Sequence, residues 1–200
     1  MFEERFGNFV KENYEIHEFG NASSIFKHDY PTEFNELKSS LENFTLKKSN
    51  LIAGGGGKSK IPPTFEDPLY KNGWIEKNFD ISISLDGVEN KIETHKIDCF
   101  KNKIGIEVEW NNKTEFYDRD LNNFRVLHSL NALDLGIIIT RCDELNDIFD
   151  TLNIKSKYGS STTILSKLLF KVRSGSLGGC PLLIFGIKKS LYRDNLWDKK

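Results

Sequence analysis

The sequence predicts an α/β fold in which a mixed central β-sheet is flanked by helices. Residues 79–110 contain successive strand-like segments, and from residue 118 onward amphipathic helices alternate with apolar strands. A length of 200 residues and a hydrophobic content of 38% suffice for one sizeable core. We therefore expect one domain over residues 1–200, with an N-terminal segment, 1–30, to which no role is assigned, and a charged, flexible tail at 188–200.

The first half of the chain is expected to start with helices. In residues 31–46 the apolar Phe34, Leu37 and Leu41 recur at helical spacing, and Pro31 suits a first helical turn. A glycine-rich loop at 54–60 follows, and then a short helix at 65–74. Three strands, at 79–85, 91–98 and 104–110, are expected to form a meander because apolar residues alternate in them.

The second half is expected to alternate helix and strand. The segment 134–140 is continuously apolar and therefore predicted to be a strand buried on both faces. The other predicted segments are a helix at 118–130, a helix at 143–152, a loop at 158–161, a helix at 162–173, a Gly/Ser-rich loop at 174–180 and a strand at 182–187.

Composition excludes several classes of protein. No apolar run approaches the roughly 18 residues that span a bilayer, so no membrane association is expected, and the first residues lack the apolar core of a signal peptide. Cys99, Cys142 and Cys180 are scattered and odd in number, which argues against a disulfide framework and favours the cytoplasm. A net charge of −1 remains compatible with a local basic surface that binds nucleic acid.

The most informative feature is a group of carboxylates in two neighbouring strands. Glu107 and Glu109 alternate with apolar residues, so both point to the same side of one strand. A tight turn at 101–103 would fold Asp98 back beside them, so that three carboxylates converge. Hard divalent cations such as Mg²⁺ bind oxygen ligands of this kind. The alternative is a hairpin whose acidic face is simply exposed to solvent.

The other motifs are weaker candidates for a functional site. Gly57-Lys58-Ser59 resembles part of a P-loop, but Ile52 occupies the required first glycine position and Pro62 follows where a helix should open. No nucleotide triphosphate site is expected; the loop is better suited to contacting phosphates. The four histidines lack metal-binding spacing, and His95 is expected to be a surface residue peripheral to the carboxylates.

The pattern D-(x)8-E-x-E on a hairpin, followed by an amphipathic helix and a buried strand, resembles type II restriction endonucleases of the group that contains BglII, BstYI and BamHI. Their nuclease core is usually written PD-(D/E)XK, with the lysine replaced by Glu or Gln. Asp98, Glu107 and Glu109 match the three motif positions, and Glu76, after Trp74, matches a further acidic position less closely. The resemblance covers roughly residues 51–187 and implies a restriction-endonuclease-like core.

The resemblance implies Mg²⁺-dependent hydrolysis of phosphodiester bonds in both strands of a short palindromic site in double-stranded DNA. Asp98 and Glu107 would hold Mg²⁺, which makes a bound water more acidic. Glu109 would orient or deprotonate the attacking water, and Glu76 would assist. Crowding of the three carboxylates should raise their proton affinity until metal binds.

Cutting both strands of a palindrome implies a homodimer, whose interface in the related enzymes includes the helix predicted here at 118–130. Phosphate contacts are expected from Lys47, Lys48, Lys58 and Lys60. Base contacts are expected from polar groups at one end of the sheet, namely Asn111, Asn112, Tyr158, Ser160, Ser161, Arg173, Ser174 and Ser176.

The sequence leaves three alternative functions. A repair or recombination nuclease with the same core would nick DNA without preference for a palindrome. A non-catalytic DNA-binding module is disfavoured because Asp98, Glu107 and Glu109 are all present. A P-loop phosphotransferase would require ATP binding that depends on Lys58.

Overall fold

The central element is a six-stranded sheet in which parallel and antiparallel neighbours are mixed. A computed structural model describes residues 2–52, 59–92 and 94–194. Within the sheet β7, β8 and β9 are parallel, whereas β1, β6 and β3 run antiparallel to their neighbours. In spatial order the strands are β1 (Tyr14–Phe19), β9 (Leu182–Ile187), β8 (Leu135–Arg141), β7 (Ile104–Val108), β6 (Ile97–Lys101) and β3 (Ile75–Lys77).

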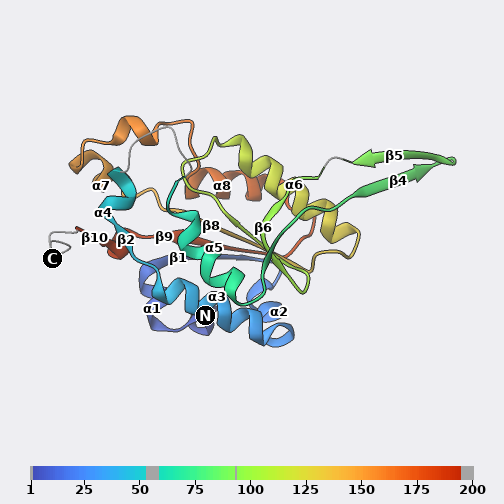
Figure 1. Ribbon diagram of the computed structural model, residues 1–200, viewed down its shortest axis with the longest axis horizontal. Coiled ribbons are helices and arrows are strands. Elements are labelled where there is room, and N and C mark those ends of the chain that lie inside the picture. The colour runs from blue at the N-terminus through green and yellow to red at the C-terminus, as the bar shows by residue number, and fades with distance from the viewer. Residues whose placement is uncertain (1, 53–58, 93, 195–200) are drawn as a thin grey trace.

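Helices cover both faces of this sheet (Figure 1). One face is covered by α1 (Asn8–Asn13), α2 (Ala22–Asp29), α3 (Pro31–Asn43) and α5 (Pro62–Lys71). The opposite face is covered by α6 (Glu115–Ser129) and α8 (Leu165–Lys171). The described chain thus confirms the predicted mixed sheet flanked by helices, as in restriction-endonuclease-like folds.

Smaller elements connect these layers. They are the 3₁₀ turns η1 (Phe2–Phe6), η2 (Lys155–Tyr158) and η4 (Lys189–Leu191), the short helices α4 (Lys48–Ile52) and α7 (Leu145–Thr151), the π-helical turn η3 (Val172–Ser176), and the paired strands β2 (Leu46–Lys47) and β10 (Tyr192–Arg193). Because η4 and β10 are ordered against the rest of the chain, the tail expected at 188–200 is structured at least to residue 193.

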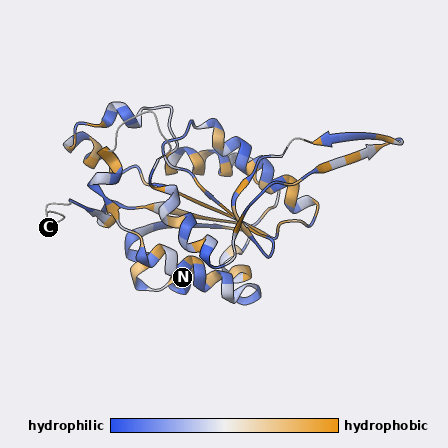
Figure 2. Cartoon of the chain, in the orientation of Figure 1, coloured by the Kyte–Doolittle hydropathy of each residue, from blue (hydrophilic) through white to orange (hydrophobic). Residues whose placement is uncertain are grey.

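The central strands are mostly apolar, as Figure 2 shows by colour. All residues of β7, β8 and β9 are buried, which confirms the prediction for 134–140 and 182–187. Ile106 and Phe185 pack toward α1, α2, α3 and α5, whereas Ile138 and Ile184 pack toward α6 and α8. Among the described residues, no helix has the length and apolarity needed to cross a bilayer.

The predicted three-strand meander is wrong. The strand expected at 79–85 is β4 (Ile81–Leu85), and it pairs only with β5 (Val88–Ile92) in a separate hairpin that projects away from the body (Figure 1). The strand expected at 91–98 is divided between β5 and β6. The alternation of apolar residues was correct, but most side chains of the hairpin are exposed and do not meet the sheet.

Helix boundaries also differ from those predicted. The helix expected at 31–46 ends at Asn43, because Phe44 is extended and Leu46 enters β2. The helix expected at 65–74 begins three residues earlier, since Pro62 and Pro63 occupy the first helical turn. The helix expected at 162–173 begins at Leu165 and changes into the π-helical turn η3. The N-terminal segment supplies β1, an edge strand of the main sheet.

Candidate active site

A tight turn between β6 and β7 brings Asp98 beside Glu107. Asn102 and Lys103 both have positive φ, at 46° and 66°, so the chain reverses within two residues. The paired register runs from Lys101–Ile104 to Cys99–Ile106, which places Asp98 beside Glu107 just beyond the last pair. The turn predicted at 101–103 is thereby confirmed.

Asp98 and Glu107 bind backbone amides across the end of this ladder. The Val108 N–H donates to Asp98 Oδ2 at 3.0 Å, and the Asp98 N–H donates to Glu107 Oε2 at 3.4 Å. Glu107 is only 1% exposed, and its Oε1 atom has no hydrogen-bond donor among the described residues. One oxygen of a buried carboxylate is therefore left for a ligand.

Glu109 lies just beyond the end of β7 and is held by two side chains. Its Oε2 accepts a hydrogen bond from Asn112 Nδ2 at 2.8 Å, and its Oε1 lies 3.8 Å from Arg119 Nη2. The side chain is also buried, at 2% exposure. Burial of both Glu107 and Glu109 excludes the alternative of a hairpin with an exposed acidic face.

Asp120 is a fourth carboxylate that the sequence interpretation missed. It lies on α6, is fully buried, and accepts hydrogen bonds from Arg119 Nε at 3.2 Å and Nη2 at 3.1 Å. A signal was present, since Asp120 stands three residues after Tyr117 and four before Phe124, on the apolar face of the helix. A charged residue on such a face requires an explanation.

Burial and mutual repulsion make these carboxyl groups more basic. Burial raises the pKa of Glu107 well above its usual range, and the negative charges of Asp120, Asp98 and Glu109 add to the effect. The pKa of Asp120 is raised by burial and by Glu109. Burial also raises the pKa of Glu109, although Asn112 and Arg119 oppose the shift. The expected rise in proton affinity is thus present at Glu107 and Glu109, with desolvation as its main cause.

The donor chemistry fits a hard divalent cation, because carboxylate oxygens are available and Glu107 Oε1 is unsatisfied. However, among the described residues no three His, Cys, Asp or Glu side chains form a group that could hold a metal ion. The expected convergence of three carboxylates into one such group is therefore not observed. The reason is local: Asp98 faces the Val108 amide, whereas Glu109 turns to Asn112 and Arg119.

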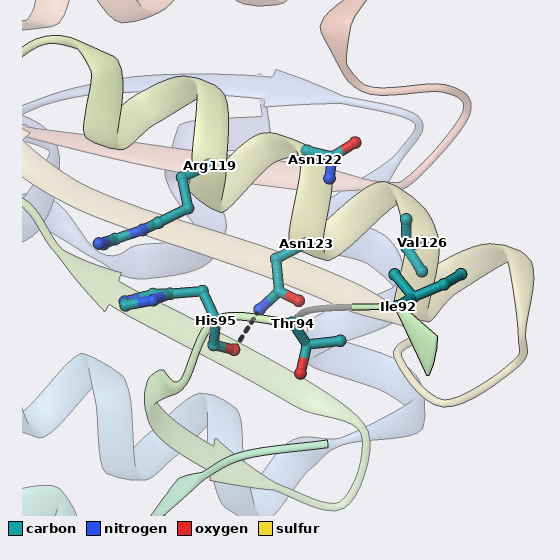
Figure 3. Close-up of a pocket in the computed structure, with 7 residues that line it drawn as sticks. All are labelled: Ile92, Thr94, His95, Arg119, Asn122, Asn123 and Val126. Atoms are coloured by element: carbon teal, nitrogen blue, oxygen red, sulfur yellow. Dashed lines mark hydrogen bonds between the residues drawn. The ribbon is translucent and has the colours of Figure 1, made fainter. Parts of the chain in front are cut away.

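A small pocket lies next to Arg119, between α6 and the segment that enters β6 (Figure 3). In Figure 3 the Arg119 guanidinium and the His95 ring point in the same direction, while Asn123 Nδ2 donates to the His95 carbonyl at 2.9 Å. Partial burial and the positive charge of Arg119 lower the pKa of His95. His95 is thus half-buried rather than a simple surface residue.

Comparison with known protein families agrees with this geometry. A model of the restriction endonuclease BglII/BglIII family matches residues 14–187. This chain belongs to that family. A search of curated proteins found no match. The family match begins at Tyr14, the first residue of β1, and so extends further upstream than the resemblance expected at 51–187.

As a restriction endonuclease, the protein is a site-specific deoxyribonuclease, a hydrolase that acts on phosphodiester bonds in DNA. The carboxylates lie at the carboxyl ends of the parallel strands, where loops can meet a ligand. Two such loops contact each other here: the Thr163 N–H donates to the Asn112 carbonyl at 2.8 Å, and the Thr114 N–H donates to the Ser161 carbonyl at 2.9 Å.

These loops carry four of the residues expected to bind DNA. Ser160 and Ser161 are exposed, and Asn111 and Asn112 are partly exposed. Asn111 has a positive φ of 61°, and its Oδ1 atom has no donor among the described residues. Asn112 already donates to Glu109, so this endonuclease connects a candidate base-reading side chain to its carboxylates.

Other predicted site residues are not brought to this place. Tyr158 is buried and stacks on Phe149 at 4.0 Å between ring centroids, so it is a core residue. Arg173, Ser174 and Ser176 lie in η3, which leads into the start of β9. They therefore lie at the amino ends of the parallel strands, opposite the end that carries the carboxylates. The prediction that these three residues lie with the other base-contacting candidates is wrong, because a sequence does not show at which end of a sheet a loop lies.

The remaining predicted residues are peripheral. Glu76, on β3, is exposed and forms an ion pair with Lys96 at 2.8 Å. Lys47 and Lys60 are exposed, while Lys48 pairs with Asp194 at 3.2 Å. Lys58 lies outside the described residues.

Proposed function

We propose that this restriction endonuclease hydrolyses both strands of a short palindromic site in double-stranded DNA, depends on Mg²⁺ and acts as a cytoplasmic homodimer of one nuclease domain. The observation that carries the proposal is the pair of buried glutamates, Glu107 and Glu109, beside Asp98 at the end of β7. Burying carboxylates costs folding free energy, so their presence in this chain favours a role in the reaction.

Asp98 and Glu107 would hold the metal. When bound, Mg²⁺ supplies positive charge for the scissile phosphate and makes water more acidic. The chain prepares for it through the unsatisfied Glu107 Oε1 and through the Val108 amide, which fixes the Asp98 carboxylate. Glu76 is a candidate for assistance from the edge strand, although it is ion-paired with Lys96.

Glu109 would orient the attacking water or take its proton. Burial raises the pKa of this carboxylate, which makes it a better proton acceptor. Asn112 and Arg119 contact its two oxygens and thereby fix its direction. A fixed acceptor is more effective than a mobile one because the reacting atoms must align.

DNA would lie across the loops at the carboxyl ends of β7 and β8. Asn111, Asn112, Ser160 and Ser161 are the candidates for base contacts there. Lys47, Lys48, Lys58 and Lys60 are candidates for phosphate contacts, which predicts that binding weakens steeply with salt. Tyr158 would support this surface from below, whereas contacts by Arg173, Ser174 and Ser176 would require DNA to reach the other end of the sheet.

The decisive experiment digests phage DNA with the purified protein and Mg²⁺ and sequences the fragment ends. Discrete ends at one palindrome are expected; random ends would indicate a non-specific nuclease, and intact DNA would reject the proposal. Asp98→Ala, Glu107→Ala and Glu109→Ala should each abolish cleavage while a duplex containing the site is still bound. Full cleavage by Glu107→Ala would exclude the assigned centre.

A further inference from the structure

Asp120 is a buried carboxylate that the proposed nuclease mechanism does not use. It is fully buried on α6, and its Oδ2 atom has no hydrogen-bond donor among the described residues. The same guanidinium nitrogen, Arg119 Nη2, contacts Asp120 Oδ1 at 3.1 Å and lies 3.8 Å from Glu109 Oε1, so the Asp120 carboxylate lies on the side of α6 that faces the centre. A buried carboxylate with an unsatisfied oxygen is costly, and such groups persist where they serve function.

Arg119 links this carboxylate to the centre. Both Nε and Nη2 of its guanidinium donate to Asp120 Oδ1, at 3.2 and 3.1 Å, and Nη2 also lies 3.8 Å from Glu109 Oε1. The guanidinium stacks on Phe116 at 4.1 Å from the ring centroid. Arg119 is one-third exposed, and without Asp120 its remaining contacts with the described residues would be the 3.8 Å contact with Glu109 and the stacking on Phe116.

The contacts of Glu109 therefore come from two directions. Asn112 holds Oε2 from the loop after β7, and Arg119 holds the Oε1 side from α6. The loop partner faces the expected DNA surface, whereas the helix partner is fixed from within the core by Asp120.

We propose that Asp120 is a positioning residue of the nuclease centre, which holds the Arg119 guanidinium against Glu109 so that Glu109 keeps the orientation needed to act on the attacking water. This inference rests on the proposed role of Glu109. It assigns no metal to Asp120 and no contact with DNA.

The test compares three variants in single-turnover cleavage of a duplex that contains the site read from phage DNA fragments. Asp120→Leu keeps the approximate volume but cannot accept from Arg119, and its rate constant should fall about 10- to 100-fold, as for other residues that orient reacting groups. Asp120→Asn retains one acceptor oxygen and should lose less than about fivefold. Asp118→Asn is the control, because Asp118 lies on the same helix but is exposed and pairs with Lys171 at 2.7 Å.

Two further readouts separate positioning from folding. The dissociation constant for the duplex should be unchanged in all three variants, since Asp120 is fully buried and neither Asp120 nor Asp118 is among the residues proposed to contact DNA. Arg119→Leu should reproduce the loss in rate, and adding Asp120→Leu to it should cause no further loss, because both substitutions break one link. Circular dichroism checks that each variant is folded; if Asp120→Leu is not, Arg119→Leu and Asp120→Asn carry the comparison.

Wild-type rates in folded Asp120→Leu, equal losses in Asp120→Asn and Asp120→Leu, or additive losses with Arg119→Leu would each overturn the inference. Failure of the proposed function is a different result. It would appear as no cleavage by the unaltered protein, or as full cleavage by Glu107→Ala.

Discussion

Glu107 is an acidic residue in an otherwise apolar strand, and it is almost completely removed from solvent. The pKa of this carboxyl group is raised in the folded protein, so the folded state binds its proton more tightly than the unfolded chain does. The resulting stabilisation is complete below the ordinary pKa of 4.5 and is lost as the pH rises toward the folded value. At neutral pH, burial of the Glu107 carboxyl group therefore lowers the free energy of unfolding.

Glu107→Gln should therefore stabilise the metal-free protein at alkaline pH. In EDTA, urea unfolding at pH 8 should give a free energy of unfolding higher by about 1 kcal/mol or more than that of the unaltered protein, because the buried charge is gone. The difference should shrink at pH 5. Glu89→Gln is the control, since Glu89 is exposed on β5; a pH-independent effect of Glu107→Gln would contradict the explanation.

At the scale of elements, the position of α6 depends on two glycines. Gly105 and Gly136 are paired across β7 and β8, and Phe124 of α6 sits directly above both. A Cβ atom at Gly136 would lie 2.5 Å from the Phe124 ring. This close approach lets α6 cover Glu107 and bring Asp120 beside it.

Gly136→Ala should lift α6 from the sheet and destabilise the protein by about 1–3 kcal/mol, as overpacked cores do. Chemical denaturation measures the change. Gly159→Ala serves for comparison, because its Cβ would meet nothing within 4 Å, and it should have little effect. Equal stability of the two variants would show that the sheet can yield at Gly136.

The β4–β5 hairpin should be dispensable for folding. Its apolar residues Ile83, Leu85 and Val88 are exposed, so they contribute little burial. Replacing residues 82–91 with a two-residue turn should change the free energy of unfolding by less than about 1 kcal/mol, as for other surface changes. Thermal unfolding tests this expectation, and a large loss would mean that the hairpin packs against the body in solution.

At the scale of the whole molecule, the proposed homodimer requires an apolar surface that is open in one protomer. Phe170, on α8, is 74% exposed, and Leu130, at the end of α6, is 47% exposed. The two helices contact each other on the same face of the sheet. This face contains α6, the helix expected from the family resemblance to form the dimer interface.

Phe170→Asp should weaken the dimer, because a charge would be buried in the interface. Sedimentation should shift from dimer to monomer at micromolar protein, and supercoiled plasmid should accumulate as nicked circles instead of linear DNA. Phe9→Asp, at a partly exposed aromatic of α1 on the opposite layer, is the matched control. A Phe170→Asp dimer with unchanged linearisation would exclude this face.

The secondary-structure elements and the chemical groups of the site could be predicted from the amino-acid sequence alone. Apolar periodicity located β8, β9, α6 and the turn before β7, and the spacing of Asp98, Glu107 and Glu109 placed them at neighbouring positions, because these features depend on residues close in the chain. Which helix covers these carboxylates could be seen only in the folded chain. Close packing of α6 on Gly105 and Gly136 buries Glu107 and adds Asp120 to the centre, because contacts between distant segments are not encoded in local periodicity.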